Sequence, residues 1–280
     1  MVEIIDTHAH LEGEEFADDL EQVVCRAQEA GVVKAFLPAI HLESVENILK
    51  VCDRFPHFAY PMVGLHPEEV KDDFREVLSI MKSRYLDHSA HSTHPFIAIG
   101  EVGLDYYWSR EFEKQQLEAF EEQVRWSVET QLPLMIHCRK AQNELVKILR
   151  KYETNLPGGV FHCFTGNEIE ARELLSFERF VLGIGGVLTF KKSHLPEVLP
   201  TTVPLNRIVL ETDSPYMAPV PHRGKRNESA YVVHVLDKLA EAYQMPREEV
   251  AMITNENVKR VFGISRFSHE MNMEILNYFK

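Results

Sequence analysis

Six residues that can bind a divalent metal follow closely on five separate apolar segments of this chain. They are His8, His10, Glu101, His137, His162 and Asp213. Imidazole nitrogens and carboxylate oxygens are common ligands of catalytic metals. If the apolar segments are strands, their ends form a rigid scaffold that holds such ligands in fixed geometry. The set therefore indicates an enzyme whose chemistry depends on bound metal.

The ligand set is larger than one metal ion needs. His8 and His10 are two residues apart, and on an extended segment such side chains share a face, so both imidazoles can reach one ion. Four imidazoles and two carboxylates exceed a tetrahedral site that keeps one position open for water. We expect two divalent ions, of zinc, manganese or iron, with Glu101 as the bridging carboxylate. A single-metal hydrolase with Glu101 in another role is the alternative.

Eight short segments rich in branched and aromatic residues recur along the chain. They span residues 2–6, 32–40, 58–65, 96–104, 132–138, 159–164, 180–188 and 207–213. Between most of them, apolar residues recur at helical spacing, as in 16–30, 113–131 and 143–152. This alternation predicts parallel strands, and eight units in about 260 residues predict an α/β fold of the (β/α)8 barrel type. A doubly wound sheet is the alternative.

The barrel is predicted to occupy residues 1–263 as a single domain. Residues 189–206 are polar and contain prolines, which predicts a short or irregular helix, and 214–228 is predicted to be a long loop. Helices are expected at 229–243, 247–254 and 255–262. Residues 264–280 are predicted to form a helical tail.

Barrel enzymes place their catalytic groups at the carboxyl ends of the strands. His66, after the third segment, is predicted to act in catalysis by contacting a substrate oxygen or the metal-bound water, with loop capping as the alternative. Phosphate binding is predicted for basic residues after the fifth and eighth segments, with a solvated loop as the alternative. These residues are Arg139, Arg223, Lys225 and Arg226. Asp105, with Tyr106, is a further candidate for substrate binding or ligand support.

Other histidines and cysteines are predicted to lie outside the metal site. His88, His91 and His94 fall between a helix and the next strand, which places them on the opposite face of a barrel. Cys138 and Cys163 each follow a proposed ligand directly. On an extended strand they would point away from it, towards the helices, as buried thiols.

The composition is that of a soluble protein, with 45% hydrophobic and 26% charged residues. No targeting or membrane-spanning segment is apparent, and the four cysteines form no disulfide pattern, so a cytoplasmic location is expected. The formal net charge of -13 argues against indiscriminate binding to nucleic acid. Any phosphate recognition must therefore be local, next to the bound cations.

Eight ordered motifs resemble one known family. They are IDTHAHL, VGLHP, IGEVGLDYY, LPLMIHCRKA, FHCFTG, IGGVLTF, LETDSPYMAP and RGKRNE. Together they resemble the TatD family of metal-dependent deoxyribonucleases, within the amidohydrolase-like barrels, over residues 4–263. The resemblance implies a (β/α)8 fold, a two-metal site made by the six residues above, activity with magnesium, and hydrolysis of DNA phosphodiesters, often by trimming of strand ends. Lys140 and Ser229 depart from the family pattern, which bears on substrate preference.

The predicted mechanism assigns Asp213 as metal ligand and general base for the attacking water. The predicted partner is a single DNA strand or a strand end, with no membrane and no obligate protein partner. Two alternatives are kept. One is hydrolysis of a small-molecule ester, amide, lactone or phosphotriester on the same barrel, and the other is a non-catalytic metal-binding scaffold.

Overall fold

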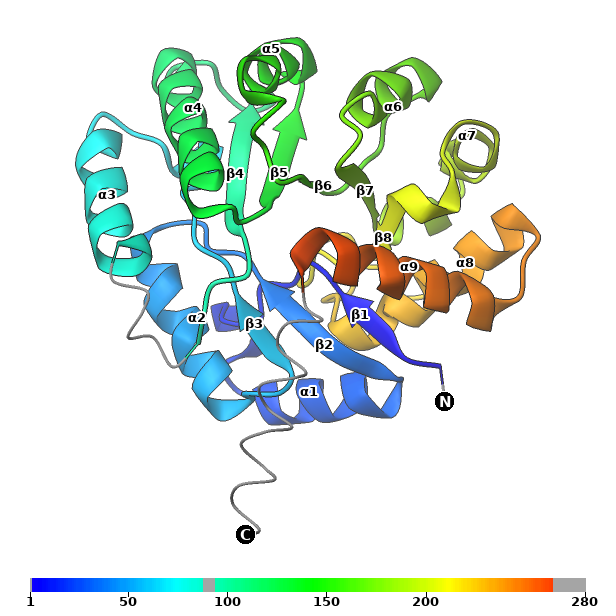
Figure 1. Cartoon of the computed structure of the whole chain (residues 1–280). Helices are drawn as coiled ribbons and strands as arrows, with labels where there is room; N and C mark the ends of the chain where they lie inside the picture. The colour runs from blue at the N-terminus through cyan, green and yellow to red at the C-terminus, as the bar shows by residue number, and fades with distance from the viewer. Residues whose placement is uncertain (1, 88–93, 264–280) are drawn as a thin grey trace, which may run out of the picture.

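The computed structural model of the protein describes residues 2–87 and 94–263. Within them, eight parallel strands follow one another in chain order (Figure 1). They are β1 (Ile4–Asp6), β2 (Val32–Leu37), β3 (Ala59–Pro61), β4 (Ile99–Asp105), β5 (Leu134–Arg139), β6 (Gly159–Phe161), β7 (Phe180–Ile184) and β8 (Ile208–Leu210). Each predicted strand is therefore present, most of them shorter than expected.

Two seams close the strands into a ring. Strands β1 to β3 and β4 to β8 form two hydrogen-bonded groups, and a bridge between Val63 and Ile99 joins β3 to β4. At the other seam, the Thr7 amide donates to the Leu210 carbonyl at 3.0 Å, which ties β1 to β8. The predicted (β/α)8 barrel is confirmed, and the doubly wound sheet is wrong.

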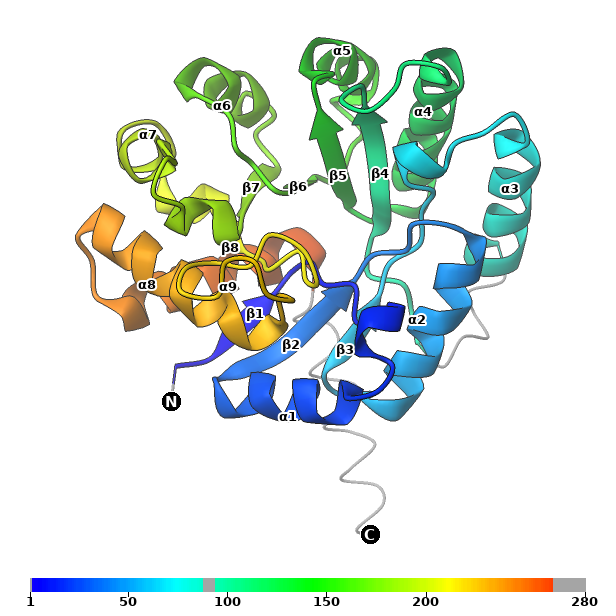
Figure 2. The same ribbon diagram turned by 180° about the vertical axis from the view of Figure 1, so that it is seen from behind.

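Nine helices of the described residues accompany the strands, and α1 to α8 lie outside the ring (Figures 1 and 2). They are α1 (Leu20–Glu29), α2 (Leu42–Arg54), α3 (Phe74–Met81), α4 (Glu113–Thr130), α5 (Gln142–Tyr152), α6 (Glu168–Leu175), α7 (Leu195–Thr202), α8 (Val232–Tyr243) and α9 (Arg247–Phe262). Helix α7 is short, as expected. The prediction of two helices over 247–262 was wrong, because α9 runs through without a break. The predicted tail at 264–280 lies outside the described residues.

Helix α9 closes the amino-terminal end of the barrel. The Asn257 side-chain amide donates to the carbonyls of Leu205 and Ile208, where β8 begins. Phe262 packs against Phe36 of β2 with ring centroids 4.9 Å apart, inside a buried cluster that also takes in side chains of the other strands. This plug fills one end with apolar side chains and leaves the carboxyl end of the strands for polar groups.

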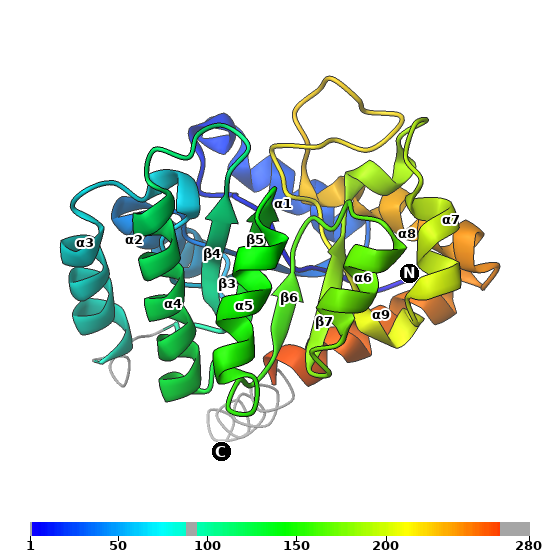
Figure 3. The ribbon, with the colours of Figure 1, turned by 90° about the horizontal axis from the view of Figure 1, so that it is seen from above.

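The carboxyl ends of the strands face the long loop after β8. In Figure 3 the arrowheads of β4 and β5 point to the edge above which this loop, residues 211–228, rises. Figure 1 shows α9 in front of the strands, whereas the reverse view in Figure 2 shows the loop in front. In the described part of the chain, no helix is long and apolar enough to cross a membrane.

Candidate metal centre

One oxygen of Glu101 lies among ligands from β1 and β8. Glu101 Oε2 is 3.2 Å from His8 Nε2 and 3.6 Å from His10 Nε2, and these two nitrogens are 3.2 Å apart. Asp213 Oδ1 lies 3.8 Å from each of them. Two imidazole nitrogens and two carboxylate oxygens thus converge on one point, which is a donor set that suits a divalent ion.

The other oxygen of Glu101 lies among imidazoles from three further strands. Glu101 Oε1 is 2.9 Å from His137 Nδ1, 3.2 Å from His162 Nε2 and 3.4 Å from His66 Nε2. Glu101 is buried at the centre of both groups, so its carboxylate spans two sets of ligands. This is the arrangement expected of a carboxylate that bridges two metals.

A carboxylate lies behind each of three imidazoles. Asp105 Oδ2 is 2.8 Å from His137 Nε2, Glu12 Oε1 is 3.5 Å from His10 Nδ1, and Glu211 Oε1 is 3.3 Å from His162 Nδ1. Such partners fix the orientation of metal-binding histidines and raise their basicity.

Glu12 and Glu211 were not singled out from the sequence. Each lies two residues from a proposed ligand, Glu12 after His10 and Glu211 before Asp213. On extended backbone that spacing places two side chains on one face. The signal was therefore present in the sequence, but it is weak without the barrel around it.

The protonation of the imidazoles shows how strongly the site attracts positive charge. Burial acts to lower the pKa of His137, but its hydrogen bonds to Asp105 and Glu101 outweigh burial and raise that pKa to about 9. For His10, burial is likewise outweighed, chiefly by Glu12, and its pKa also rises to about 9. Burial acts to raise the pKa of Glu101, but the surrounding imidazoles hold it well below its usual range. In the metal-free protein, these protons balance the negative charge of the carboxylates. A bound cation would balance the same charge, so the residues fit a metal centre.

Asp213 combines burial with an uncommon backbone conformation. Its φ of 56° lies in the left-handed region, which costs free energy for most residues but is tolerated by aspartate. The Asp213 amide donates to the His8 carbonyl at 2.9 Å and so anchors the residue to β1. Burial raises the pKa of its carboxyl to about 6, against the opposing charges of His162 and His10. Asp213 is therefore mostly ionised at neutral pH and is held in place by the barrel seam.

Comparison with known proteins shows the family. A family model described as TatD related DNase matches residues 5–263. The chain belongs to the TatD family. It is 37% identical over 262 residues to the uncharacterized metal-dependent hydrolase YabD of Bacillus subtilis (strain 168), which covers 94% of this chain and 100% of that protein.

Two further relatives support this membership. The chain is 28% identical over 273 residues to the 3'-5' ssDNA/RNA exonuclease TatD of Edwardsiella piscicida, covering 94% of this chain and 100% of that one. The solved structure of YJJV, a TatD homolog from Escherichia coli K12, superposes with a TM-score of 0.80 at 28% identity, over 93% of this chain and 98% of that chain. The resemblance to the TatD family is confirmed, and the protein is a TatD-family metal-dependent hydrolase.

The structure places the predicted substrate residues of this TatD-family protein in different surroundings. The Arg139 guanidinium lies 3.6 Å from the ring centroid of Tyr107, at the mouth of the site. Asp105 is buried and contacts His137, so its position suits support of that ligand, one of the two roles predicted for it. The Tyr106 hydroxyl is buried, with no hydrogen-bond partner among the described residues.

The three basic residues after β8 also differ from one another. Arg223 is exposed and stacks on Phe190, with its guanidinium 3.6 Å from the ring centroid, and Lys225 is exposed. Arg226 instead makes two contacts of 2.7 Å to Asp19, in the turn before α1. A bidentate ion pair of this kind leaves little of the guanidinium for a substrate phosphate. Arg226 thus connects the β8 loop to the turn before α1, and its role in substrate binding stays a prediction.

The cysteines next to the ligands are less buried than predicted. Cys138 and Cys163 are partly buried and border the same cavity as His162. Cys163 has a φ of 49° and follows the end of β6, so the alternation expected of an extended strand does not apply to it. Burial raises the pKa of each thiol to about 12, so both are neutral thiols at physiological pH.

The three histidines predicted to lie outside the site are partly described. His94 contacts Asp53 of α2 at 2.8 Å. That contact lies at the carboxyl end of α2, just before β3, on the amino-terminal side of the barrel. His88 and His91 lie outside the described residues.

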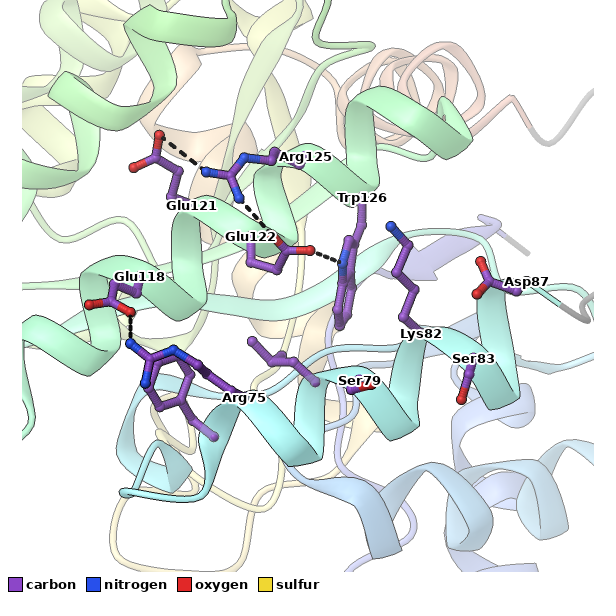
Figure 4. Close-up of a pocket in the computed structure, with 12 residues that line it drawn as sticks. Arg75, Ser79, Lys82, Ser83, Asp87, Glu118, Glu121, Glu122, Arg125 and Trp126 are labelled. Carbon is purple, nitrogen blue, oxygen red and sulfur yellow. Dashed lines mark hydrogen bonds and ion pairs between the residues drawn. The ribbon is translucent and has the colours of Figure 1, made fainter.

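Two cavities of similar size differ in their relation to the metal centre. One, of about 620 Å³, extends from His162 past Arg139 to Tyr107. The other, of about 510 Å³, lies between α3 and α4 in the helix layer and contains none of the proposed ligands. Its two arginines pair with glutamates of the same cavity, Arg75 with Glu118 and Arg125 with Glu121 and Glu122 (Figure 4). Because those charges are satisfied by protein groups, the cavity beside His162 is the better candidate for substrate.

Proposed function

We propose that this TatD-family hydrolase cleaves the phosphodiester bonds of single-stranded DNA, working from strand ends. The observation that carries the proposal is the carboxylate of Glu101, whose two oxygens lie 2.9 to 3.6 Å from the imidazole nitrogens of two separate ligand groups. A pair of metals is suited to phosphoryl transfer, because it acts on both the attacking and the leaving oxygens. The exonuclease TatD of Edwardsiella piscicida supports the choice of substrate.

Each proposed ion has a defined set of ligands. His8, His10, Asp213 and Glu101 Oε2 would hold one ion, and His137, His162 and Glu101 Oε1 would hold the other. When bound, the ions supply Lewis acidity that favours ionisation of water and neutralises charge on the phosphate. The mixed nitrogen and oxygen donors suit zinc or manganese better than magnesium, which prefers oxygen. We therefore propose zinc, manganese or magnesium as the bound ion, with the donor set favouring the first two.

His66 is proposed as a hydrogen-bond donor to the substrate. Its Nδ1 accepts a hydrogen bond from the Glu68 amide at 3.1 Å, so Nδ1 carries no proton. Burial lowers the pKa of His66, so the ring is neutral and its proton is on Nε2. That nitrogen faces Glu101 Oε1 and is a donor, which suits a nonbridging phosphate oxygen better than a metal.

Asp213 is proposed as the general base. In the metal-free protein, burial raises its carboxyl pKa to about 6 and so increases its proton affinity. Its other duty, as a ligand, is consistent with its 3.8 Å distance to His8 and His10. Arg139, Arg223 and Lys225 are proposed to bind the strand phosphates next to the centre.

The test is hydrolysis of single-stranded DNA by the metal-loaded protein, alongside Glu101→Gln and Asp213→Asn. Both variants are expected to lose at least about 1,000-fold in kcat, because each removes a charge from the centre. Asp87→Asn is the matched control, since Asp87 is an exposed aspartate between α3 and β4, on the amino-terminal side of the barrel, and it should keep full activity. Wild-type rates in either site variant would refute the assignment.

The alternative functions are separated by the same assay. Small-molecule esters, amides, lactones and phosphotriesters are tested side by side with DNA, and faster turnover of any of them would displace DNA as the substrate. If the protein is a non-catalytic scaffold, none of these substrates will show metal-dependent turnover, that is, turnover that chelation abolishes and added metal restores. The cytoplasmic location and the absence of an obligate protein partner stay predictions.

A further inference from the structure

Two exposed aromatic rings and an arginine border the mouth of the metal centre. Tyr107 and Trp108, directly after β4, are 48% and 71% exposed, and their rings meet edge to face at 4.8 Å. Arg139, at the end of β5, lies over both rings, 3.6 Å from the Tyr107 centroid and 5.5 Å from the Trp108 centroid. We call Tyr107, Trp108 and Arg139 the aromatic platform. Neighbouring exposed aromatic rings beside a cavity form a flat apolar surface that suits a ligand.

The aromatic platform is fixed to the metal centre by hydrogen bonds. The Tyr107 amide donates to Asp105 Oδ1 at 2.8 Å, and Asp105 Oδ2 contacts His137 Nε2 at 2.8 Å. One buried carboxylate therefore holds both a proposed metal ligand and the backbone of the platform. Tyr107 and Arg139 also line the 620 Å³ cavity that reaches His162. A group bound on the platform would thus lie within reach of a phosphate at the centre.

Arg139 leaves its hydrogen-bond donors available. Among the described residues, the contacts recorded for its guanidinium are those with the two aromatic rings, and no carboxylate forms an ion pair with it. Arg226, by contrast, donates to the Asp19 carboxylate and to the Glu15 carbonyl. A guanidinium that stacks through its face keeps its edge free to bind a phosphate oxygen. The platform therefore combines a flat apolar face with a cationic edge.

We propose that the aromatic platform is a subsite for one unpaired nucleobase and its phosphate, next to the bond that is cut. The base would stack on Trp108, and Arg139 would bind the phosphate. A base within a duplex has both faces covered by its neighbours, so this subsite selects single strands. The inference rests on the proposed function, and deepens it by naming the structural origin of the strand preference.

The first test compares two substrates in Trp108→Ala. On a thymidine strand, loss of stacking should raise KM by about 10-fold or more with a smaller change in kcat. On the same strand with abasic residues at the cleaved end, wild type and variant should have equal KM, because there is no base to stack. Trp108→Phe keeps a stacking ring and should stay near the wild type. Met252→Ala, at an exposed side chain on α9, is the control for loss of surface apolar area.

The second test does not need cleavage. The chain has two tryptophans, and Trp126 is buried, so quenching by an added strand reports on Trp108. A phosphorothioate-linked thymidine strand should quench the fluorescence of the metal-loaded wild type and leave that of Trp108→Phe unchanged, since only Trp126 remains there. If the protein cleaves no DNA but shows this quenching, the proposed function fails and the subsite survives.

Three outcomes would overturn the subsite. One is an equal loss for Trp108→Ala on the normal and abasic strands, which would show a structural effect. Another is an unchanged KM on both strands, which would assign the exposed rings to some other partner, such as a protein. The third is quenching by the strand that persists in Trp108→Phe.

Discussion

Asp105 shares its carboxylate between the His137 imidazole and the Tyr107 amide, with both contacts at 2.8 Å. We predict that Asp105→Asn reduces metal affinity and kcat together by about 10- to 100-fold, the usual cost of removing a carboxylate behind a metal-binding histidine. Metal content after dialysis and steady-state kinetics measure the two effects. If the variant raised KM alone and kept its metal, Asp105 would be a substrate contact after all.

Three imidazoles must lose protons when metal binds. Neighbouring carboxylates raise the pKa of His10 and of His137 to about 9 in the metal-free protein, and raise that of His162 well above its ordinary value. At pH 7 each of these rings therefore carries a proton, whereas a ligand nitrogen must be free. Metal affinity should rise as the pH increases from 7 towards 9. Calorimetric titration in two buffers of different ionisation enthalpy should show a release of about three protons per chain at pH 7. Binding without proton release would contradict these shifts.

At the scale of single residues, the sequence predicted which side chains lie close together better than it predicted what each side chain does. The pair His8 and His10 and the strand-end position of Asp213 were enough to predict that these side chains meet. The partner of Arg226 was not predictable, because Asp19 lies 207 residues away in the sequence and only the folded barrel brings them together. A basic run after the last strand looks the same whether its charges face substrate or an acidic side chain.

At the scale of elements, the approach of β4 to β5 depends on Gly103. Its φ is 151°, and a Cβ there would lie 1.8 Å from the His137 carbonyl oxygen. We predict that Gly103→Ala lowers the free energy of unfolding by about 3 to 5 kcal/mol, through strain and through displacement of β5. Chemical denaturation measures this loss, and activity should fall with it because His137 moves.

A second glycine provides the matched control. Gly224, in the β8 loop, also has positive φ, at 78°, but nothing lies within 4 Å of its virtual Cβ. Gly224→Ala should therefore lower the free energy of unfolding only through backbone strain, by about 1 to 2 kcal/mol. Equal losses in the two variants would show that the contact with β5 contributes little.

Periodicity predicted the elements well where it was strong and failed where polar residues have tertiary partners. All eight strands were recognised because they are short apolar runs between helical patterns. The false break at 254 and 255 came from a polar stretch within α9. There, the Thr254 hydroxyl donates to the Val250 carbonyl at 3.0 Å, and the side-chain amide of Asn257 donates to the Ile208 carbonyl at 2.7 Å. These polar groups are satisfied by the helix itself and by β8, so the helix continues.

At the scale of the whole molecule, the metal centre lies across the seam that closes the barrel. The Asp213 amide donates to the His8 carbonyl at 2.9 Å, and the His10 amide to the Ser214 carbonyl at 2.8 Å. The proposed ligands flank these bonds and come from five strands. Bound ions would therefore join β1 and β8 to the opposite side of the ring, through Glu101.

Removal of metal should consequently destabilise the barrel. An ion present at about 100 times its Kd contributes about 2.7 kcal/mol to folding. We predict that chelation lowers Tm by about 5 °C or more, and that zinc or manganese restores it. Calorimetry measures the shift, and Glu101→Gln, which weakens both ligand groups, should show a smaller response to the chelator than the wild type does.

The destabilisation caused by chelation should be greatest at the seam between β1 and β8. If the ions hold the seam, chelation should speed hydrogen exchange most at the amides of Thr7, His10 and Asp213, which donate between β1 and β8. The amides of Ala35 and Met62, which join β2 to β3, lie away from the ligands and should change little. Uniform acceleration across both pairs of strands would mean that metal stabilises the barrel without fastening its seam, and that ring closure rests on backbone hydrogen bonds and core packing alone.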